Sequence, residues 1–286
     1  MDSTMKKLLF IFVSLLVCGY YTCGQTVDTL VILHTDDVHS QVEPKKNDDK
    51  GGAKRRMGAI EQVRARYDNV LLLDAGDFTQ GSSYYCVFKG RTDVELMNKM
   101  GYAAATLGNH EFDLGAEFLA DSIIPLADFP IVLANYKFDK GFALSKKNVP
   151  PYVILDTMGL RIGIFGLLVD LQGLTAHSEI FDKPGMHYQN PVDVARKLSA
   201  KLNKQKKCDL VICLSHLGWR TETGTHPDEL DENIADLPFV DLVIGGHNHD
   251  SRPNNRSKDG TFYVQNKNQG VEIGIFKIPF VKQENK

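Results

Sequence analysis

The sequence predicts an α/β fold in which parallel and antiparallel strand pairs are mixed within two stacked β-sheets. Short apolar runs with strand character alternate with segments of helical periodicity, which is typical of α/β proteins. Two regions depart from this alternation: a predicted hairpin that turns at Thr157–Leu160, and C-terminal strands with no helix between them. The 286 residues are 43% hydrophobic and 24% charged, as expected for a globular protein with a large core.

We place the helices and strands from the spacing of hydrophobic residues and from residues typical of helix ends. Predicted strands are Leu30–His34, Val70–Asp74, Ala103–Leu107, Ile131–Ala134, Tyr152–Asp156, Arg161–Leu168, Leu210–Leu214, Leu242–Gly245, Thr261–Gln265 and Val271–Pro279. Predicted helices are Met57–Tyr67, Asp93–Lys99, Ala116–Ile123 and Val192–Lys206. Thr92 with Glu95 predicts a capping box for the second helix. Asn190 before Pro191 predicts the N-cap of the fourth.

The N-terminus has the features of an export signal. Two lysines precede the apolar run Leu8–Val17, which is too short for a comfortable transmembrane helix. We therefore expect a signal peptide over residues 1–24 and one domain over residues 25–286. The alternatives are an uncleaved anchor, or a lipoprotein modified at Cys18 or Cys23. The protein is expected in the periplasm or at the cell surface, and at a membrane only if it is lipidated.

Charge and cysteine content exclude several other classes of protein. The formal net charge is -3, so no overall basic field favours a nucleic-acid polymer as partner. Outside the predicted signal the cysteines are Cys86, Cys208 and Cys213. The last two point to opposite faces if both are extended, so they are not expected to pair. The sequence therefore indicates neither a disulfide scaffold nor a zinc ribbon.

Candidate functional residues gather at the ends of predicted strands, where sites form in α/β sheets. Carboxylate, amide or imidazole side chains follow the apolar strands in these segments: His34–His39, Asp74–Phe78, Gly108–Glu111, Ser215–His216 and Gly245–His249. Hard oxygen ligands and imidazoles without a thiolate suit divalent metals such as zinc, manganese or iron. The sequence therefore predicts a site for two metal ions.

The spacing of the ligands suggests how they are divided. Asp77 follows a glycine turn and is the natural carboxylate to bridge two ions. Asp37 and His39 are two residues apart, share a face and can chelate one ion. His247 and His249 can do the same, unless the glycine turn before them separates them between the two ions.

These segments, in their order, resemble the motifs of the metallophosphoesterase (calcineurin-like) family. The matching residues are Asp37-x-His39, Gly76-Asp77, Gly108-Asn109-His110-Glu111, His216 and Gly246-His247-x-His249. Flanking residues, among them Gln80-Gly81 and Phe112-Asp113, resemble the secreted 5′-nucleotidase branch, with its UDP-sugar hydrolases and 2′,3′-cyclic phosphodiesterases. The resemblance covers nearly all of the expected mature chain.

The resemblance implies a four-layer αββα sandwich of two mixed sheets flanked by helices, with two divalent ions at the strand ends. It assigns one ion to Asp37, His39, Asp77 and His249. It assigns the other to Asp77, Asn109, His216 and His247. Two such ions, about 3.5–4 Å apart, lower the pKa of a bridging water and clamp phosphoryl oxygens, so that a hydroxide attacks phosphorus in line with the leaving oxygen.

The resemblance also implies a catalytic dyad of His110 and Asp113. His110, with Asn109, would contact the phosphate and stabilise or protonate the leaving oxygen, and Asp113 would orient the imidazole and raise its pKa. Asp113 also fits a helix cap. Arg55 and Arg56 fit either a phosphate contact or a solvated helix face.

Several neighbouring residues are expected to support the site rather than react. Glu111 fits a structural role, either behind the ligands or at the surface. Asp36 stands where the family usually has asparagine, and fits a turn or a contact to a ligand. Asp74 is expected to bind backbone at its strand end. Trp219 fits either the substrate cleft or packing.

The resemblance leaves substrate recognition open. In this branch a C-terminal domain binds the nucleoside, and this chain ends at Lys286, directly after the last predicted strands. We expect a phosphomonoesterase that acts on nucleotides. The alternatives are the catalytic half of a split nucleotidase with a separate nucleoside-binding chain, or a 2′,3′-cyclic nucleotide phosphodiesterase. A non-catalytic module is disfavoured because the set of ligands is complete.

Overall fold

The computed structural model describes residues 27–47, 49–144, 149–174, 185–222, 224 and 226–281. The chain divides into two compact units, residues 30–278 and residues 1–29 with 279–286. In the second unit only Val27–Thr29 and Pro279–Val281 are described, and both are extended. The predicted signal peptide and its lipidation alternative lie outside the described residues.

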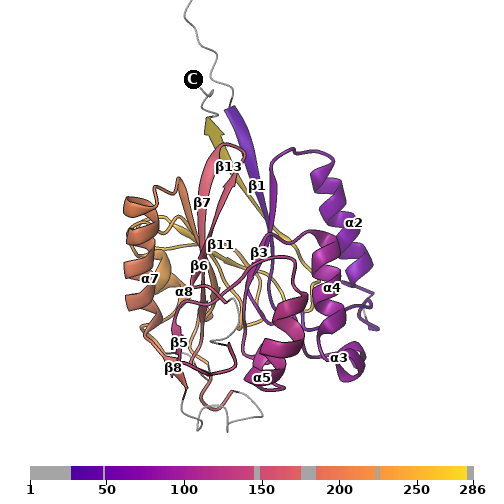
Figure 1. The fold of residues 1–286 in the computed structure, drawn as a ribbon. Coiled ribbons are helices and arrows are strands. Elements are labelled where there is room, and N and C mark those ends of the chain that lie inside the picture. The colour runs from indigo at the N-terminus through magenta and orange to yellow at the C-terminus, as the bar shows by residue number, and fades with distance from the viewer. Residues whose placement is uncertain are drawn as a thin grey trace, which may run out of the picture. The chain divides into compact units, whose positions relative to one another are not determined.

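Two sheets form the larger unit (Figure 1). The first has the order β13-β1-β2-β3-β4, and its strands β1 to β4 are parallel. Its strands are β1 (Val27–Thr35), β2 (Val70–Asp74), β3 (Ala104–Thr106), β4 (Ile131–Val132) and β13 (Gly274–Val281).

The second sheet has the order β11-β12-β10-β9-β7-β6. Its inner strands are parallel, whereas β6 with β7 and β11 with β12 are antiparallel. Its strands are β6 (Tyr152–Thr157), β7 (Leu160–Leu168), β9 (Leu210–His216), β10 (Leu242–Ile244), β11 (Arg252–Arg256) and β12 (Phe262–Gln265). The predicted hairpin is β6–β7. A separate antiparallel pair joins β5 (Tyr136–Phe138) to β8 (Met186–Tyr188).

The two sheets pack face to face. Gly166 of β7 approaches the first sheet so closely that an added Cβ would lie 2.2 Å from the Val132 oxygen and 2.4 Å from Thr106 Oγ1. Helices cover both outer faces (Figure 1). On one side lie α2 (Ala53–Arg64), α3 (Ser83–Phe88), α4 (Arg91–Met100) and α5 (Ala116–Phe118), and on the other α7 (Pro191–Ala200) and α8 (Asp231–Ala235). The predicted α/β fold of two mixed sheets is confirmed.

The helix ends differ in part from the prediction. The expected capping box at Thr92 is wrong: α4 starts at Arg91 and its N-cap is Gly90, with φ 88°. The glycine adopts the left-handed turn that lets the helix begin two residues earlier, which puts Thr92 inside it. The Asn190 cap is confirmed, since its Oδ1 accepts from the Asp193 N–H at 3.0 Å.

Other differences concern short elements. The helix predicted from Met57 is α2, which begins four residues earlier, directly after Gly51 and Gly52 with φ 72° and 89°. Helices α3 and α8 and strands β5, β8 and β11 are not predicted, because each is too short to show a period. Cys86, Cys208 and Cys213 are free, so the expectation that the last two do not pair is confirmed.

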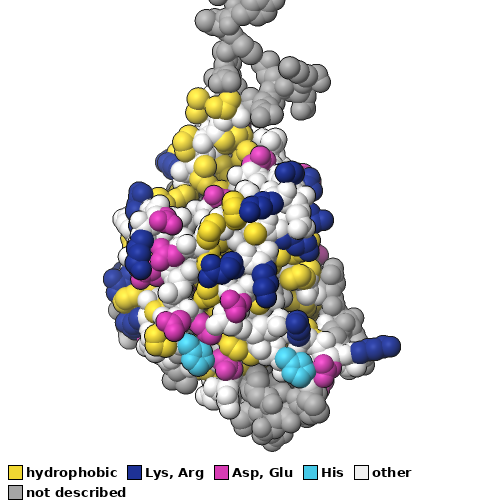
Figure 2. Space-filling view, turned by 90° about the vertical axis from the view of Figure 1, so that its left-hand side faces the viewer, with side chains coloured by type: hydrophobic (Ala, Val, Ile, Leu, Met, Phe, Trp, Pro, Cys, Tyr) yellow, Lys and Arg dark blue, Asp and Glu magenta, His cyan; other side chains and the backbone are white. Residues whose placement is uncertain are grey.

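The outer face on the α7 side carries Lys and Arg side chains interspersed with Asp and Glu (Figure 2). No basic area extends continuously over the described atoms of that face. Within the described ranges, no helix has the length and apolar character needed to cross a membrane.

The two helix starts provide a matched test of capping. Replacing Asn190 with alanine removes a cap, and we expect the free energy of unfolding to fall by about 1 kcal/mol. Replacing Thr92 with alanine removes no cap, and the change should stay within about 0.5 kcal/mol. Urea unfolding of the two variants measures both. An equal loss in both would show that the assigned helix starts are wrong.

Candidate metal centre

The candidate ligands come from both sheets and meet at one edge. Segments that follow β1, β2 and β3 carry Asp37, Asp77 and Asn109, while His216 ends β9 and His247 follows β10. Within each sheet these strands are parallel. Their carboxyl ends therefore point the same way, as the strand-end argument requires.

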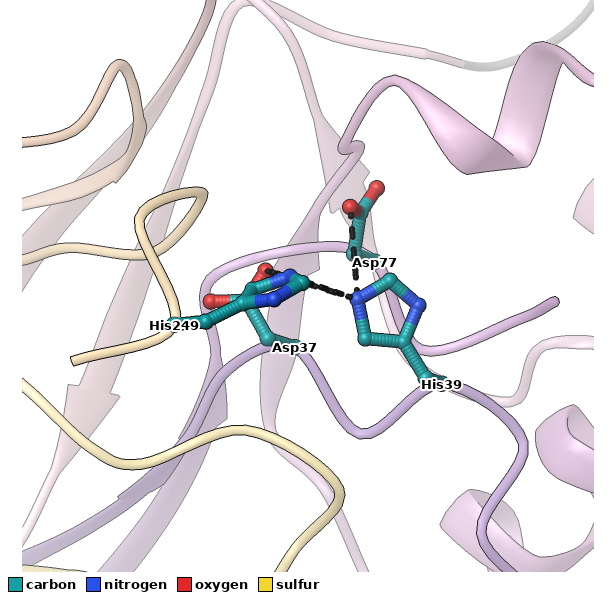
Figure 3. Close-up of side chains that lie close together, drawn as sticks. All are labelled: Asp37, His39, Asp77 and His249. Carbon is teal, nitrogen blue, oxygen red and sulfur yellow. Dashed lines mark hydrogen bonds and ion pairs between the residues drawn. The ribbon is translucent and has the colours of Figure 1, made fainter. Parts of the chain in front are cut away.

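A first group of ligands consists of Asp37, His39, Asp77 and His249 (Figure 3). One atom of each lies within 4.8 Å of the others. His39 Nε2 is 2.9 Å from His249 Nε2 and 3.8 Å from Asp77 Oδ2. His249 Nε2 is 3.6 Å from Asp37 Oδ1. Two carboxylates and two imidazoles therefore face a single point.

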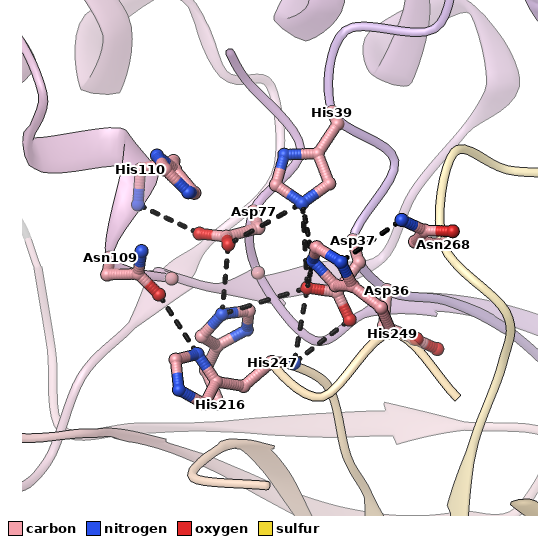
Figure 4. Close-up of polar contacts among 12 residues, drawn as sticks. Asp36, Asp37, His39, Asp77, Asn109, His110, His216, His247, His249 and Asn268 are labelled. Carbon is pink, nitrogen blue, oxygen red and sulfur yellow. Dashed lines mark hydrogen bonds and ion pairs between the residues drawn. The ribbon is translucent and has the colours of Figure 1, made fainter. Parts of the chain in front are cut away.

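A second group lies on the other side of Asp77 (Figure 4). His216 Nε2 is 3.2 Å from Asp77 Oδ2, and the His216 and His247 rings are 5.4 Å apart at their centroids. His247 Nδ1 is 3.1 Å from Asn109 Oδ1. All seven ligands named from the sequence are thus brought together, with Asp77 between the two groups.

The structure also distinguishes between the two arrangements of His247 and His249. His249 faces His39 and Asp37, whereas His247 faces His216 and Asn109. Both residues have left-handed backbone, with φ 80° and 61°. The turn after Gly246 therefore separates the two imidazoles between the groups.

Unusual backbone conformations place the ligands. Asp37, His39 and Asp77 all have left-handed φ, at 47°, 48° and 54°. Such conformations cost about 1 kcal/mol or more for each non-glycine residue, so surrounding contacts must maintain them. Backbone bonds join the two loops: Asp37 N–H donates to Gly76 O at 3.0 Å, and His39 N–H to Asp77 O at 2.9 Å.

Glu111 is buried and joins the two segments that follow β2 and β3. Its Oε2 accepts from the N–H groups of Asp77 at 2.9 Å and Gly108 at 2.7 Å, and its Oε1 accepts from Thr79 N–H at 2.9 Å. Its role is therefore structural, and it lies behind the ligands rather than at the surface.

Other supporting residues lie behind the first group. Asp36 is buried and accepts from the Asn266 N–H at 3.0 Å and from its side-chain amide at 2.8 Å. Asp74 accepts from the Gly76 N–H at 2.9 Å, as expected for a strand-end aspartate. Sequence reasoning missed Asn268, whose amide lies 3.1 Å from His249 Nδ1. No spacing signal marks that asparagine as part of the site.

Several carboxylates are buried in the centre, which is electrostatically unfavourable unless positive charges lie near them. Burial raises the pKa of Asp37 to about 7, against the opposing charge of His216. Burial acts in the same direction on Asp77, but the positive charges of His216 and His39 bring its pKa well below the usual range. Burial lowers the pKa of His216, yet the Asp77 carboxylate raises it to about 10. A further cation would offset the unfavourable burial of the Asp37 carboxylate.

The residues fit a divalent cation on chemical grounds. His216 Nδ1 donates to the Ala75 carbonyl at 2.8 Å, which leaves the Nε2 lone pair for a ligand bond. That Nε2 is buried and has no hydrogen-bond partner among the described residues. Ligand atoms that share one ion at about 2.1 Å lie about 3 Å apart, comparable with the 3.2 Å between His216 Nε2 and Asp77 Oδ2.

His110 and Asp113 form a hydrogen-bonded pair beside the two groups. His110 Nδ1 is 2.8 Å from Asp113 Oδ2, and the His110 N–H donates to Asp77 Oδ1 at 2.9 Å. Burial acts to lower the pKa of His110, but the bond to Asp113 and the charge of Asp77 raise it to about 9. Asp113 therefore contacts the imidazole rather than capping the helix at Ala116, whose N-cap is Gly115.

A cavity of about 440 Å³ opens beside both groups. It is lined by Asp77, Asn109, His110, Leu174, Glu222, His247 and His249. Sequence reasoning missed Leu174 and Glu222, which lie in irregular segments without a motif. Trp219 does not line this cavity; Arg252 stacks on its ring at 3.7 Å.

The two arginines proposed for phosphate lie elsewhere. Arg55 is exposed and pairs with Asp49 at 2.9 Å. Arg56 is buried, and its Nη1 donates to the Gln41 carbonyl at 2.9 Å. Neither lines the cavity beside the ligands, so the structure does not bring them to the candidate centre.

The fold and the two groups of candidate ligands are compatible with a phosphoesterase that binds two metal ions, and comparison with known proteins names the family. Residues 30–251 match the family model of calcineurin-like phosphoesterases, so the chain belongs to that family.

Several relatives are 5′-nucleotidases by name. The chain is 34% identical over 293 residues to the snake venom 5′-nucleotidase of Gloydius brevicauda, covering 98% of this chain and 45% of that protein. It is 32% identical to the 5′-nucleotidase of Rattus norvegicus, covering 88% of this chain and 41% of that protein. The chain thus spans less than half the length of these relatives.

Solved structures agree with this placement. The 5′-nucleotidase precursor from Thermus thermophilus superposes with a TM-score of 0.74 at 30% identity, covering 87% of this chain and 51% of the other. The calcineurin-like phosphoesterase YfkN from Bacillus subtilis superposes with a TM-score of 0.72 at 26% identity, covering 91% of this chain and 87% of the other.

The close approach of Gly108 to Asp77 gives a test of the centre. A Cβ on Gly108 would lie 2.1 Å from Asp77 Oδ1 and 2.5 Å from Asp77 N. We expect Gly108→Ala to displace Asp77 and to abolish stoichiometric divalent-metal binding, measured by elemental analysis after dialysis. Gly58→Ala is the control, because nothing lies within 4 Å of its added Cβ. Metal content equal in the two variants would contradict the assignment.

The His110–Asp113 bond predicts a pH dependence. A pKa of about 9, raised from 6.5, means that protonated His110 stabilises the folded state below about pH 6.5, and that this stabilisation is lost as pH rises through 9. Asp113→Asn removes one cause of the shift. NMR titration of the metal-free protein should give a lower His110 pKa in that variant. The stability difference between wild type and variant should shrink from pH 6 to pH 10, and an unchanged pKa would refute the coupling.

Proposed function

We propose that this chain is a metal-dependent phosphoester hydrolase, and specifically a 5′-nucleotidase-like phosphomonoesterase that acts on nucleotides. The observation that carries the proposal is that two ligand groups share Asp77 and face one cavity together with the His110–Asp113 pair. Family membership and the names of the relatives support the reaction class.

In this proposal Asp37, His39, Asp77 and His249 hold one divalent ion, and Asp77, Asn109, His216 and His247 hold the other. Zinc, manganese and iron all suit these ligands. When bound, two such ions supply an activated water and charge stabilisation for the phosphoryl oxygens.

The chain's own residues complete the chemistry. His110 lines the cavity, and its raised pKa keeps it protonated near neutral pH. It can therefore donate a proton to the leaving oxygen or stabilise charge there. Asp113 holds Nδ1 of His110, which leaves Nε2 for the substrate. The Asn109 amide lines the same cavity and can contact the phosphate.

A second candidate is the catalytic half of a split enzyme, which needs a separate nucleoside-binding chain. It is favoured by the lining of the cavity, where no Phe, Tyr or Trp is found among the described residues and Leu174 is the one aliphatic side chain. Base recognition usually needs apolar stacking area. Helix α3, which lies a few residues after Asp77, exposes Val87 by 69% and Phe88 by 48%, so an apolar surface is available to a partner.

We also propose export to the periplasm or the cell surface. The charged and apolar pattern of residues 1–24 supports it, as does the venom origin of one relative. A 2′,3′-cyclic nucleotide remains the alternative substrate.

A substrate panel tests the proposal. The purified chain loaded with Zn²⁺ or Mn²⁺ should hydrolyse p-nitrophenyl phosphate and nucleoside monophosphates in a phosphate-release assay. His110→Ala should lower kcat by about 10²–10⁴-fold through loss of the proton donor, and Asp77→Asn should lose nearly all activity. His187→Ala is the control, since His187 is exposed and pairs with Asp139 at 3.1 Å.

The outcomes separate the candidates. Preference for a cyclic nucleotide would favour the phosphodiesterase. Hydrolysis of p-nitrophenyl phosphate with little preference among nucleotides would favour the split enzyme. A metal-loaded protein that cleaves no phosphate ester would refute the proposal.

A further inference from the structure

Arg56 is a buried cation that the proposed reaction does not use. It lies in the first turn of α2 and is only 6% exposed. Its Nη1 donates to the Gln41 carbonyl at 2.9 Å, while its Nε is buried without a hydrogen-bond partner among the described residues. A buried guanidinium with so few bonds is costly unless other charges compensate it.

Two buried carboxyl groups line the same small cavity as the guanidinium. Arg56, Asp74, Asp93 and Tyr102 line one cavity of about 10 Å³, close to the space that one water needs. Burial is the largest influence on the pKa of Arg56 and lowers it, while the charges of Asp93 and Asp74 act in the opposite direction. The guanidinium and the two carboxyl groups therefore line one buried cavity between α2, α4 and the end of β2.

Each carboxylate holds a segment that carries ligands. Asp74 Oδ1 accepts from the Gly76 N–H at 2.9 Å, directly before Asp77. Asp93 Oδ2 accepts from Ser40 Oγ at 2.8 Å, directly after His39. Ser40 itself has left-handed backbone with φ 52°, so its conformation depends on such contacts.

Arg56 also abuts a third segment. Gly270 has φ 57°, and a Cβ there would lie 2.5 Å from Arg56 Nη1. In the residues just before Gly270, the Gln269 N–H donates to the Asp37 carbonyl at 2.6 Å, and the Asn268 amide lies 3.1 Å from His249 Nδ1. The guanidinium thus packs against the segment that contacts Asp37 and His249, and it does not line the cavity beside the candidate ligands.

We propose that Arg56 is a positioning residue for the first metal ion, because its buried guanidinium holds together the three segments that carry Asp37, His39, Asp77 and His249. The proposal rests on the proposed function only in assuming that these four residues bind a metal. The guanidinium bonds to Gln41, packs against Gly270 and lines one small cavity with Asp74 and Asp93. These contacts would help to maintain the strained turns at Asp37, His39 and Asp77. The effect of Arg56 reaches the substrate only through the ligands.

Arg56→Lys tests this while keeping the charge that Asp74 and Asp93 require. Lysine lacks the planar guanidinium that bonds to Gln41 and packs against Gly270. We therefore expect the affinity for Zn²⁺ or Mn²⁺ to weaken about tenfold or more, as for other groups that orient ligands. Competition with a chromophoric chelator measures it with the metal ion alone. Hydrolysis by this variant should recover as free metal is raised, with KM for substrate little changed.

Arg64→Lys is the matched control. Arg64 is in the same helix and donates to the carbonyls of Met100 at 2.6 Å and Gly101 at 3.0 Å, but it touches none of the three segments. If each arginine only connects neighbouring segments, both variants should lose stability to a similar extent. The proposal adds that only Arg56→Lys should lose metal affinity. A folded Arg56→Lys protein that binds metal as the wild type does would overturn the proposal.

Ser40→Ala covers the case in which Arg56→Lys does not fold. It keeps the buried charges and cuts only the bond between Asp93 and the His39 segment. We expect metal affinity to fall by about threefold to tenfold in a folded protein, and wild-type affinity in this variant would also overturn the proposal. If the wild type binds metal but cleaves no ester, the proposed function fails while these affinities still decide the role of Arg56.

Discussion

The geometry of the centre depends on the position of the Asp77 carboxylate. Its Oδ2 is 3.8 Å from His39 Nε2 and 3.2 Å from His216 Nε2, so it belongs to both ligand groups. Its Oδ1 accepts from the N–H of His110, the residue that pairs with Asp113. Displacing this single side chain would therefore change both groups and the dyad together. That explains why the surrounding structure is organised to hold it.

Asp77 is held by groups that bond to its backbone rather than to its carboxylate. Glu111 accepts from its N–H, the Asp37 loop bonds to the peptides on either side of it, and Gly108 leaves no space for any shift toward β3. The backbone and side-chain contacts of Asp77 therefore have different roles. The backbone contacts define where Asp77 sits in its left-handed conformation, while the carboxylate oxygens stay free for cations and for the His110 amide.

This arrangement buries several carboxyl groups close together. Asp36, Asp37, Asp74, Asp77 and Glu111 are all buried at one edge of the sheets. Burial raises the pKa of Asp37, Asp74 and Glu111 to about 7 each. Isolated buried carboxylates are strongly unfavourable, so each needs donors or cations nearby. Arg56 lines the same small cavity as Asp74, and the proposed metal ions would offset the charges of Asp37 and Asp77.

The sequence predicted the fold class and named candidate ligands that the structure brings together, because both depend on the abrupt change from apolar to polar residues along the chain. Apolar strands that end abruptly in Asp, Asn or His are visible without tertiary information, and their order along the chain matched a family pattern. The separation of His247 from His249 was left open, because it depends on two left-handed φ angles that residue spacing does not determine. The cap predicted at Thr92 was wrong for a similar reason, since the left-handed Gly90 starts α4 two residues earlier than the motif suggests.

Arg55 and Arg56 show where sequence reasoning reaches its limit. They are adjacent and chemically identical, and from the sequence they had to share one interpretation. A helix turns by about 100° between successive residues, so neighbours in α2 face different surroundings. Arg55 is exposed beside Asp49, whereas Arg56 faces the buried carboxylates behind the ligands. Function in this part of the chain therefore depends on which side of the helix faces the core. The spacing of apolar residues can indicate which side of a helix faces the core only where that apolar pattern is strong. The first turn of α2 is too polar to show its buried side, since it reads Ala53-Lys54-Arg55-Arg56.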